Sequence, residues 1–202
     1  MSQSVFLTRH GSRQDSDPNW AKTAMRPFDP GLSPEGVKQA QQLARRLTGE
    51  KVAHIFASPF LRTMETAYYI AQALALPIKV EAGLAEWLNP SWFKKAPELL
   101  PPSALVRKFP RVDLAYKSIV QPVFPETIDD LIARTSATMK ALSAQYPENI
   151  LLVGHGASVV GVTFSLTETP SEMNCPSCGL FKFMKRDDSW VMELNADTSH
   201  LK

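Results

Sequence analysis

The stretch Leu-Thr-Arg-His-Gly-Ser-Arg at residues 7–13 places one histidine between two arginines, where a short apolar run ends. A neutral imidazole attacks phosphorus well and leaves readily, so it can divide one difficult displacement into two easier ones. Guanidinium groups suit the same chemistry because their planar fork binds two phosphate oxygens and stays charged. We therefore predict that His10 is a nucleophile toward a phosphoryl group, which Arg9 and Arg13 help to bind.

Three later residues complete the set that such a reaction needs. Arg62 falls in the first turn of a predicted helix, where free backbone N–H groups and the helix dipole also favour an anion. Glu86 can protonate a leaving oxygen and then take a proton from water. His155 lies between two glycines, which let the backbone approach a ligand closely, and it can donate a further hydrogen bond. Phosphoryl transfer depends mainly on positioning and on stabilisation of charge.

The pattern of apolar, capping and turn residues predicts the scaffold that must bring these residues together. Apolar runs predict strands at residues 4–8, 52–57, 78–80 and 150–153. Periodic apolar positions predict helices at 34–48, 59–74, 126–145 and 156–166, the first two with serine as the N-cap. Residues 180–184 and 190–194 are predicted to form an antiparallel pair. The fold class is α/β, as a three-layer α/β/α sandwich with a mostly parallel central sheet and an antiparallel edge strand.

The site should lie at one edge of this sheet. Ligands of parallel sheets bind beyond the carboxyl ends of the strands. Arg9 and His10 end the first predicted strand, Arg62 follows the second, Glu86 follows the third and His155 ends the fourth. These polar elements are distant in sequence but should meet in one crevice.

Residues 87–125 differ in composition from the rest of the chain. Seven of the sixteen prolines lie here, together with several aromatic residues, so the segment cannot form one long helix or a regular strand. We predict a single domain at 1–202 with an ordered insertion at 87–125 over the strand carboxyl ends. The aromatic side chains either contact an apolar leaving group or form the insertion's own core: Trp87, Trp92, Phe93 and Phe124.

Composition narrows the choice of partners and location. The net charge is +2 with a pI near 8.5, which is too mild to indicate binding to nucleic acid or to an acidic membrane. No signal peptide is recognisable, and the most apolar segment is too short to span a bilayer, so a cytoplasmic protein is expected. Cys175 and Cys178 are too few for a disulfide framework or a zinc site, and they predict a turn before a strand.

The motifs together resemble those of the histidine phosphatase superfamily, also called phosphoglycerate mutase-like. The resemblance runs from residue 5 to about 165 and rests on five segments, namely 7–11 (LTRHG), 32–40 (LSPEGVKQA), 57–67 (ASPFLRTMETA), 84–87 (LAEW) and 153–156 (VGHG). It implies an α/β/α fold and a phosphohistidine on His10. It also implies that Arg9, Arg62 and His155 surround the phosphoryl group, with Glu86 as the proton donor. No metal or cofactor is expected, because the arginines already neutralise the phosphate.

The residues after the first motif distinguish the branches of this superfamily. Mutases usually continue it with Glu or Gln and then an asparagine, whereas this chain has Ser-Arg-Gln-Asp at 12–15. Arg13 and the Glu86-Trp87 pair are more similar to the branch that contains ecdysteroid-phosphate phosphatase and the suppressor-of-T-cell-receptor-signalling phosphatases. The resemblance therefore implies a phosphatase that acts on a small phosphomonoester or a phosphoprotein.

Two alternatives remain open from the sequence. A phosphoglycerate-type mutase would need a second anion site, for which the insertion offers Lys94, Lys95, Arg107, Lys108 and Arg111, unless these form only a solvated basic face. A phosphoprotein-binding pseudoenzyme would use the pocket without turnover. The sequence does not identify the substrate or the oligomeric state.

Overall fold

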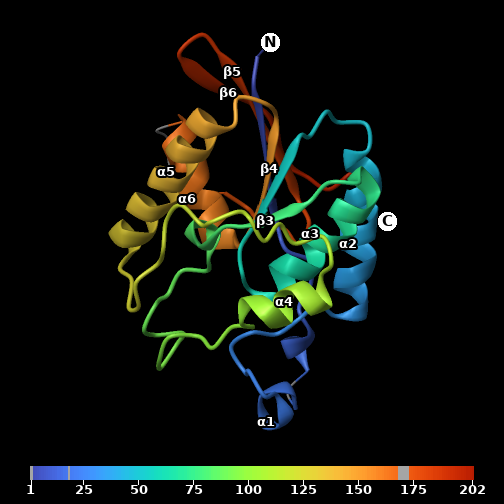
Figure 1. Cartoon of the computed structure of the whole chain (residues 1–202), viewed down its shortest axis with the longest axis vertical. Helices are drawn as coiled ribbons and strands as arrows, with labels where there is room; N and C mark the ends of the chain where they lie inside the picture. Colours follow the sequence, from blue (N-terminus) through green and yellow to red (C-terminus); the bar gives the residue numbers. More distant parts are fainter. Residues whose placement is uncertain (1, 18, 168–172) are drawn as a thin grey trace.

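The computed structural model describes residues 2–17, 19–167 and 173–202, which build one six-stranded sheet with helices on both faces (Figure 1). The sheet order is β3-β2-β4-β1-β5-β6. The strands are β1 (Ser4–Arg9), β2 (His54–Ala57), β3 (Ile78–Val80), β4 (Ile150–Gly154), β5 (Leu180–Arg186) and β6 (Ser189–Asp197). The first four are parallel, and β5 and β6 extend the sheet as an antiparallel edge. This arrangement confirms the predicted α/β/α sandwich.

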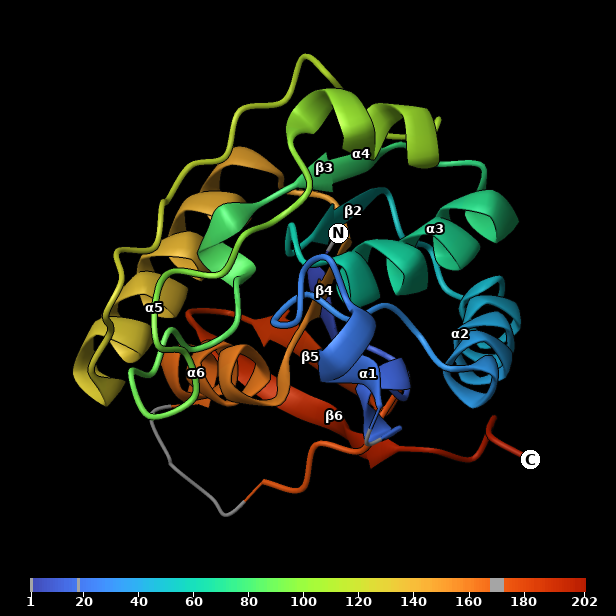
Figure 2. The ribbon, with the colours of Figure 1, turned by 90° about the horizontal axis from the view of Figure 1, so that it is seen from below.

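Two pairs of helices cover the sheet. α2 (Pro34–Leu47) packs beside α3 (Leu61–Leu74) on one face, and α5 (Ile128–Gln145) packs beside α6 (Gly156–Thr167) on the other (Figure 2). The shorter elements are α1 (Trp20–Thr23), α4 (Pro102–Lys108) and the 3₁₀ turns η1 (Gln14–Ser16) and η2 (Ala82–Leu84). No helix among the described residues has both the length and the apolarity that crossing a bilayer requires.

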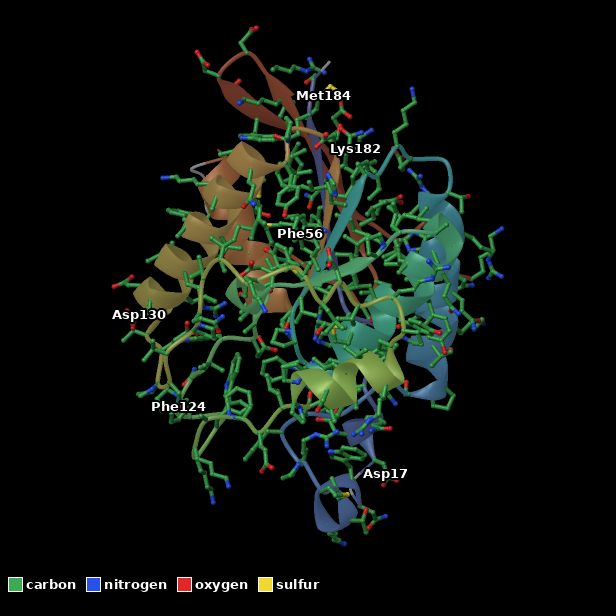
Figure 3. All side chains as sticks on the ribbon, in the orientation of Figure 1. Asp17, Phe56, Phe124, Asp130, Lys182 and Met184 are labelled. Atoms are coloured by element: carbon green, nitrogen blue, oxygen red, sulfur yellow. The ribbon has the colours of Figure 1, made fainter. Side chains whose placement is uncertain are left out.

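Alternation along the strands creates two cores. Successive side chains of a strand point to opposite faces of its sheet. Phe6 and Leu151 therefore pack under α2 and α3, whereas Leu7 and Leu152 pack under α5 and α6. Phe56, at the centre of the molecule in Figure 3, belongs to the second core. Because the parallel strands are buried on both faces, the sheet is a rigid support for the residues at its ends.

The helix starts show which of the predicted caps are correct. Ser33 caps α2, and its hydroxyl accepts a hydrogen bond from the Gly36 amide as predicted. The predicted cap at Ser58 is wrong, since α3 begins only at Leu61 and Phe60 occupies the N-cap position. The Ser58 hydroxyl instead contacts a histidine of the site, as described below.

The insertion at 87–125 lies over the carboxyl ends of the parallel strands, the end of the molecule seen in Figure 2. It contains α4 and otherwise irregular chain. Around Val112 it also pairs with Ile78, the first residue of the edge strand β3, which the sequence did not predict. This contact covers part of an otherwise open sheet edge.

A buried carboxylate fastens the end of the insertion. Glu81 is fully buried directly after β3, and its oxygens accept hydrogen bonds from the Tyr116 hydroxyl at 2.5 Å and the Ser118 hydroxyl at 2.7 Å. The backbone amides of Gly83, Ile119 and Val120 also donate to it, at 2.8, 2.9 and 3.3 Å. One side chain therefore joins the insertion to the loop that follows β3.

We expect Glu81→Ala to lower the free energy of unfolding by about 3 kcal/mol or more, because it leaves several buried donors without an acceptor. Urea denaturation would measure the change. Glu98→Ala removes an exposed carboxylate of the same insertion and should change stability by less than about 0.5 kcal/mol. Equal stability of the two variants would show that Glu81 does not fasten the insertion.

Candidate active site

Hydrogen bonds just beyond the strand ends bring the predicted residues together. The His10 amide donates to the Gly154 carbonyl at 3.0 Å, which extends the pairing of β1 with β4 by one residue. The Ser58 amide likewise donates to the Val153 carbonyl at 3.0 Å at the end of β2. His10 and His155 thereby follow neighbouring strands, and their ring centroids lie 5.3 Å apart.

His10 is held as a neutral imidazole with a defined orientation. Its Nδ1 lies 2.7 Å from the Gly11 carbonyl, which can only accept, so Nδ1 carries the proton and Nε2 keeps its lone pair. Burial is the main cause that lowers the pKa of His10 well below its usual value, and the nearby charge of Arg62 lowers it further, followed by those of Arg9 and Arg13. The arginines around His10 therefore favour its nucleophilic form.

Arg62 links the predicted nucleophile to the predicted acid. Its Nε donates to His10 Nε2 at 3.2 Å, and its Nη2 donates to Glu86 Oε2 at 3.3 Å. The guanidinium also lies 4.6 Å above the ring of Phe60, which leaves it little freedom to move. Its buried Nη1 has no hydrogen-bond partner among the described residues, so it is available to bind a ligand oxygen.

His155 lies between a serine and a carboxylate. Its Nε2 is 2.8 Å from the Ser58 hydroxyl, and its Nδ1 is 3.4 Å from Glu86 Oε2. Burial lowers the pKa of His155 well below its usual value, and the charge of Arg62 adds to this effect. When Ser58 donates to Nε2, the one proton of the neutral ring sits on Nδ1, beside Glu86.

Arg9 and Arg13 differ in how firmly they are held. Arg9 Nη1 donates to the Cys175 carbonyl at 2.8 Å, and its buried Nε has no partner among the described residues. The turn at Cys175 and Cys178, confirmed as a turn before β5, thus orients Arg9 through a backbone oxygen. Arg13 has a side chain that is 42% exposed, and it pairs with Asp15 at 2.9 Å.

A cavity of about 460 Å³ lies at the site, and the buried rings of His10 and His155 are not among the described residues that line it. Three arginines and Glu86 line it, and aromatic side chains of the insertion and of the 27–30 loop form part of its wall. The aromatic residues of the wall are Phe28, Trp92 and Phe93. The described residues that line the cavity include none of the five basic residues of the insertion. A mutase would need such residues to bind a second anion.

The structure corrects two interpretations of the sequence. Of the two glycines beside His155, only Gly156 lines the cavity, whereas a Cβ at Gly154 would lie 2.4 Å from Ser158 Oγ, so Gly154 allows close packing within the protein and not approach to a ligand. The amide of Leu61 at the start of α3 donates to Asp29 at 2.7 Å. A carboxylate of the chain itself therefore occupies the position at this helix end where a ligand anion was predicted.

Sequence reasoning missed three residues that support the site: Asp29, Ser58 and Arg134. Asp29 is buried in an irregular segment that no pattern distinguishes, and burial raises its pKa. Ser58 carried a signal, but it was interpreted as a helix cap. Arg134 is spaced three and eight residues from the buried Leu131 and Leu142, so the helical period places a charge on a buried face.

A divalent cation would find three candidate ligands here. His10, Glu86 and His155 offer ligand atoms that all lie within 4.8 Å of one another. The guanidinium of Arg62, which donates to two of the three, would repel such an ion. The site's chemistry fits an anion better, and the absence of a metal stays a prediction.

The two buried histidines make stability depend on pH. The unfolded chain binds protons near the usual histidine pKa of 6.5, whereas folding lowers the pKa of both rings. Stability present above pH 6.5 is therefore lost as the pH falls, by up to about 1.4 kcal/mol per pH unit for each ring. We expect His10→Gln to weaken this slope in urea denaturation between pH 6.5 and 5. Equal slopes in wild type and variant would contradict the prediction.

Comparisons with known proteins agree with this geometry. The family model of the histidine phosphatase superfamily (branch 1) matches residues 5–198. The chain is 29% identical, over 96% of its length, to the transcription factor tau 55 kDa subunit of Saccharomyces cerevisiae. It is 31% identical, over 65% of its length, to the ecdysteroid-phosphate phosphatase of Bombyx mori. The chain spans 51% and 21% of these two relatives.

A solved structure extends the similarity to three dimensions. The ecdysone phosphate phosphatase of Bombyx mori, in complex with tungstate, matches with a TM-score of 0.81 at 26% identity, covering 94% of this chain and 91% of that one. The match to the family model runs from β1 to β6 and includes every described residue that lines the cavity. By its sequence and by its fold, the chain belongs to the histidine phosphatase superfamily.

Proposed function

We propose that the chain hydrolyses phosphomonoesters without a metal, through a phosphohistidine on His10, with Glu86 as general acid and base. One observation carries the proposal. The Nε2 lone pair of a neutral, buried His10 faces Arg62, whose Nη1 is free to bind a phosphoryl oxygen. Membership of a superfamily that includes named phosphatases supports the reaction class.

The first step forms the phosphoenzyme. The phosphate dianion binds Arg9, Arg62 and His155, and Arg62 moves its hydrogen bond from His10 to a phosphoryl oxygen. His10 Nε2 then attacks phosphorus, and the bond between phosphorus and the leaving oxygen breaks. Glu86, in its carboxylic acid form, gives its proton to that oxygen, so the alcohol leaves neutral.

The second step returns the enzyme to its starting state. A water molecule attacks phosphorus opposite His10 and gives a proton to the Glu86 carboxylate. The bond between phosphorus and Nε2 breaks, the imidazole takes back its electron pair, and inorganic phosphate departs. His10 is again neutral with its proton on Nδ1, and Glu86 is again an acid.

The wall of the cavity favours an apolar or aromatic leaving group. Phe28 and Phe93 pack edge to face with centroids 5.5 Å apart, and Trp92, which is 53% exposed, stands beside them at the mouth. Flat rings of this kind bind aromatic groups well. We therefore expect higher kcat/KM for phosphotyrosine than for small aliphatic phosphates, and similar values would contradict this part of the proposal.

Trapping the phosphoenzyme tests the reaction. The protein is mixed briefly with para-nitrophenyl phosphate in the presence of chelator and is then denatured in alkali, and the peptide that contains His10 is analysed by mass spectrometry. We expect an acid-labile phosphate on His10. Phosphate on no residue, together with no turnover, would favour a binding protein. Conversion of 3-phosphoglycerate to 2-phosphoglycerate, without free phosphate, would favour a mutase.

A further inference from the structure

The loop that carries Glu86 has no regular structure of its own to hold it. Residues 85–88 follow the short turn η2 and form neither helix nor strand. The side chain of Glu86 is nevertheless placed between Arg62 and His155, with contacts of 3.3 and 3.4 Å. An irregular segment keeps such a placement only when groups from other elements bind its backbone.

The side chain of Arg134, on α5, makes these contacts with the loop. Its side chain is 4% exposed, and its guanidinium donates to three backbone carbonyls. Nη1 donates to Gly83 at 2.8 Å and to Ala85 at 3.2 Å, and Nη2 donates to Glu86 at 3.3 Å. The loop is thus held at the backbone of Gly83, of Ala85 and of Glu86 itself.

Glu126 completes the arrangement from the end of the insertion. Its carboxylate binds Arg134 with both oxygens, at 2.5 and 2.9 Å, and accepts from the Leu88 amide at 3.0 Å. Its backbone carbonyl accepts from the Trp87 indole at 3.0 Å, and its amide donates to the Leu88 carbonyl at 3.0 Å. The residues on both sides of Glu86 are therefore bound to one buried ion pair.

We infer that Arg134, paired with Glu126, is a positioning residue that sets the place of Glu86 for proton transfer to the leaving group. This inference rests on the proposed function, in which Glu86 is the general acid. Arginine fits the task because one planar group reaches a carboxylate and three carbonyls together, which the single ammonium of lysine cannot do. A buried ion pair adds little net stability, so holding one defined geometry is the better explanation for it.

Arg134 also acts on the second histidine. Its positive charge is among the causes that lower the pKa of His155, after burial, the charge of Arg62 and the neighbouring ring of His10. Arg134 thus supports both the placement of the acid and the neutral state of the neighbouring ring. Neither effect requires contact with the substrate.

Leaving groups of different basicity distinguish positioning from a general loss of structure. A general acid matters most when the leaving oxygen is strongly basic, as in an alkyl phosphate, and least for 2,4-dinitrophenyl phosphate. We expect Arg134→Lys to lower kcat/KM on the order of 10²-fold for an alkyl phosphate and less than about threefold for 2,4-dinitrophenyl phosphate. Because kcat/KM reports on steps up to departure of the leaving group, later hydrolysis does not obscure the comparison.

Three further variants make the outcome decisive. Glu86→Gln should show the same dependence on the leaving group, more steeply. Leu142→Ala, a core change two turns further along α5, should lower stability without any such dependence. Glu126→Gln keeps the size of the side chain but removes its charge and replaces one accepting oxygen with an NH₂ donor, so it breaks the two-oxygen contact with Arg134. It should act as Arg134→Lys does, so it replaces that variant if the latter does not fold.

The kinetics distinguish a failure of the inference about Arg134 from a failure of the proposed function. If Glu86→Gln depends on the leaving group but Arg134→Lys and Glu126→Gln lower both rates equally, as Leu142→Ala would, the inference about Arg134 is wrong and the proposed function stands. If the wild-type protein shows no turnover, or Glu86→Gln shows no dependence on the leaving group, the role of Glu86 is wrong and the inference fails with it.

Discussion

Replacement of His10 by alanine is expected to lower kcat/KM for para-nitrophenyl phosphate by at least about 10⁴-fold. The physical reason is the loss of the imidazole whose Nε2 lone pair faces Arg62 and whose other nitrogen is fixed by the Gly11 carbonyl. Steady-state release of nitrophenol, measured in chelator, would show the change. Water alone would then have to attack phosphorus, without a covalent intermediate.

A second histidine provides the control for this experiment. His54 lies at the amino end of β2, beside Glu148 at 3.3 Å, and does not contact the cavity. We expect His54→Ala to retain activity within about threefold of the wild type, because its ring does not contribute to the site. Equal rates in wild type and His10→Ala would show that the phosphohistidine route is wrong.

The second large effect is expected at Arg62, where Arg62→Lys should lower kcat/KM by about 10²- to 10³-fold. Lysine keeps a positive charge but lacks the planar fork of the buried guanidinium, which binds Glu86 through Nη2 and keeps Nη1 for a phosphoryl oxygen. The loss should appear for every leaving group, since charge on the phosphoryl oxygens develops with all of them. Kinetics with para-nitrophenyl phosphate and an alkyl phosphate would measure it.

Arg13→Lys is the matched comparison for Arg62→Lys. Its side chain is 42% exposed at the cavity wall and already pairs with Asp15, so solvent screens its charge. We expect a loss of less than about tenfold. A larger loss at Arg13 than at Arg62 would mean that the phosphate binds near the mouth of the cavity.

The sheet could be predicted well because parallel strands that are buried on both faces appear in the sequence as short apolar runs. Apolar runs and capping residues identified every strand that supports the site, and the rule for strand carboxyl ends placed His10, Arg62, Glu86 and His155 in one crevice. The errors were at element boundaries. α3 begins two residues later than predicted because Asp29, from a distant loop, caps it. Sequence spacing carries no information about such a contact.

The supporting residues were harder to predict for the same reason. Arg134 and Glu126 lie eight residues apart, but what they hold is a loop that precedes them by about forty residues. Ser58 and His155 are 97 residues apart in the sequence, yet the pairing of β2 with β4 brings their side chains to 2.8 Å from each other. Tertiary packing alone decides which polar residues become neighbours, and the sequence does not show it. The predicted catalytic residues, in contrast, can be recognised in the sequence from their residue types.

The hydrogen bond between Arg62 and His10 has a consequence for selectivity among electrophiles. The lone pair of His10 Nε2 accepts a hydrogen bond from Arg62 Nε at 3.2 Å, so the imidazole is shielded. An uncharged alkylating or acylating reagent does not attract the guanidinium of Arg62 away from His10. The lone pair of Nε2 therefore stays in its hydrogen bond and reacts poorly with such a reagent. In the proposed mechanism, a phosphate dianion attracts the guanidinium to its own oxygens and thereby releases the nitrogen that attacks phosphorus. If the proposed function is correct, the imidazole is protected from such reagents until a phosphate dianion binds.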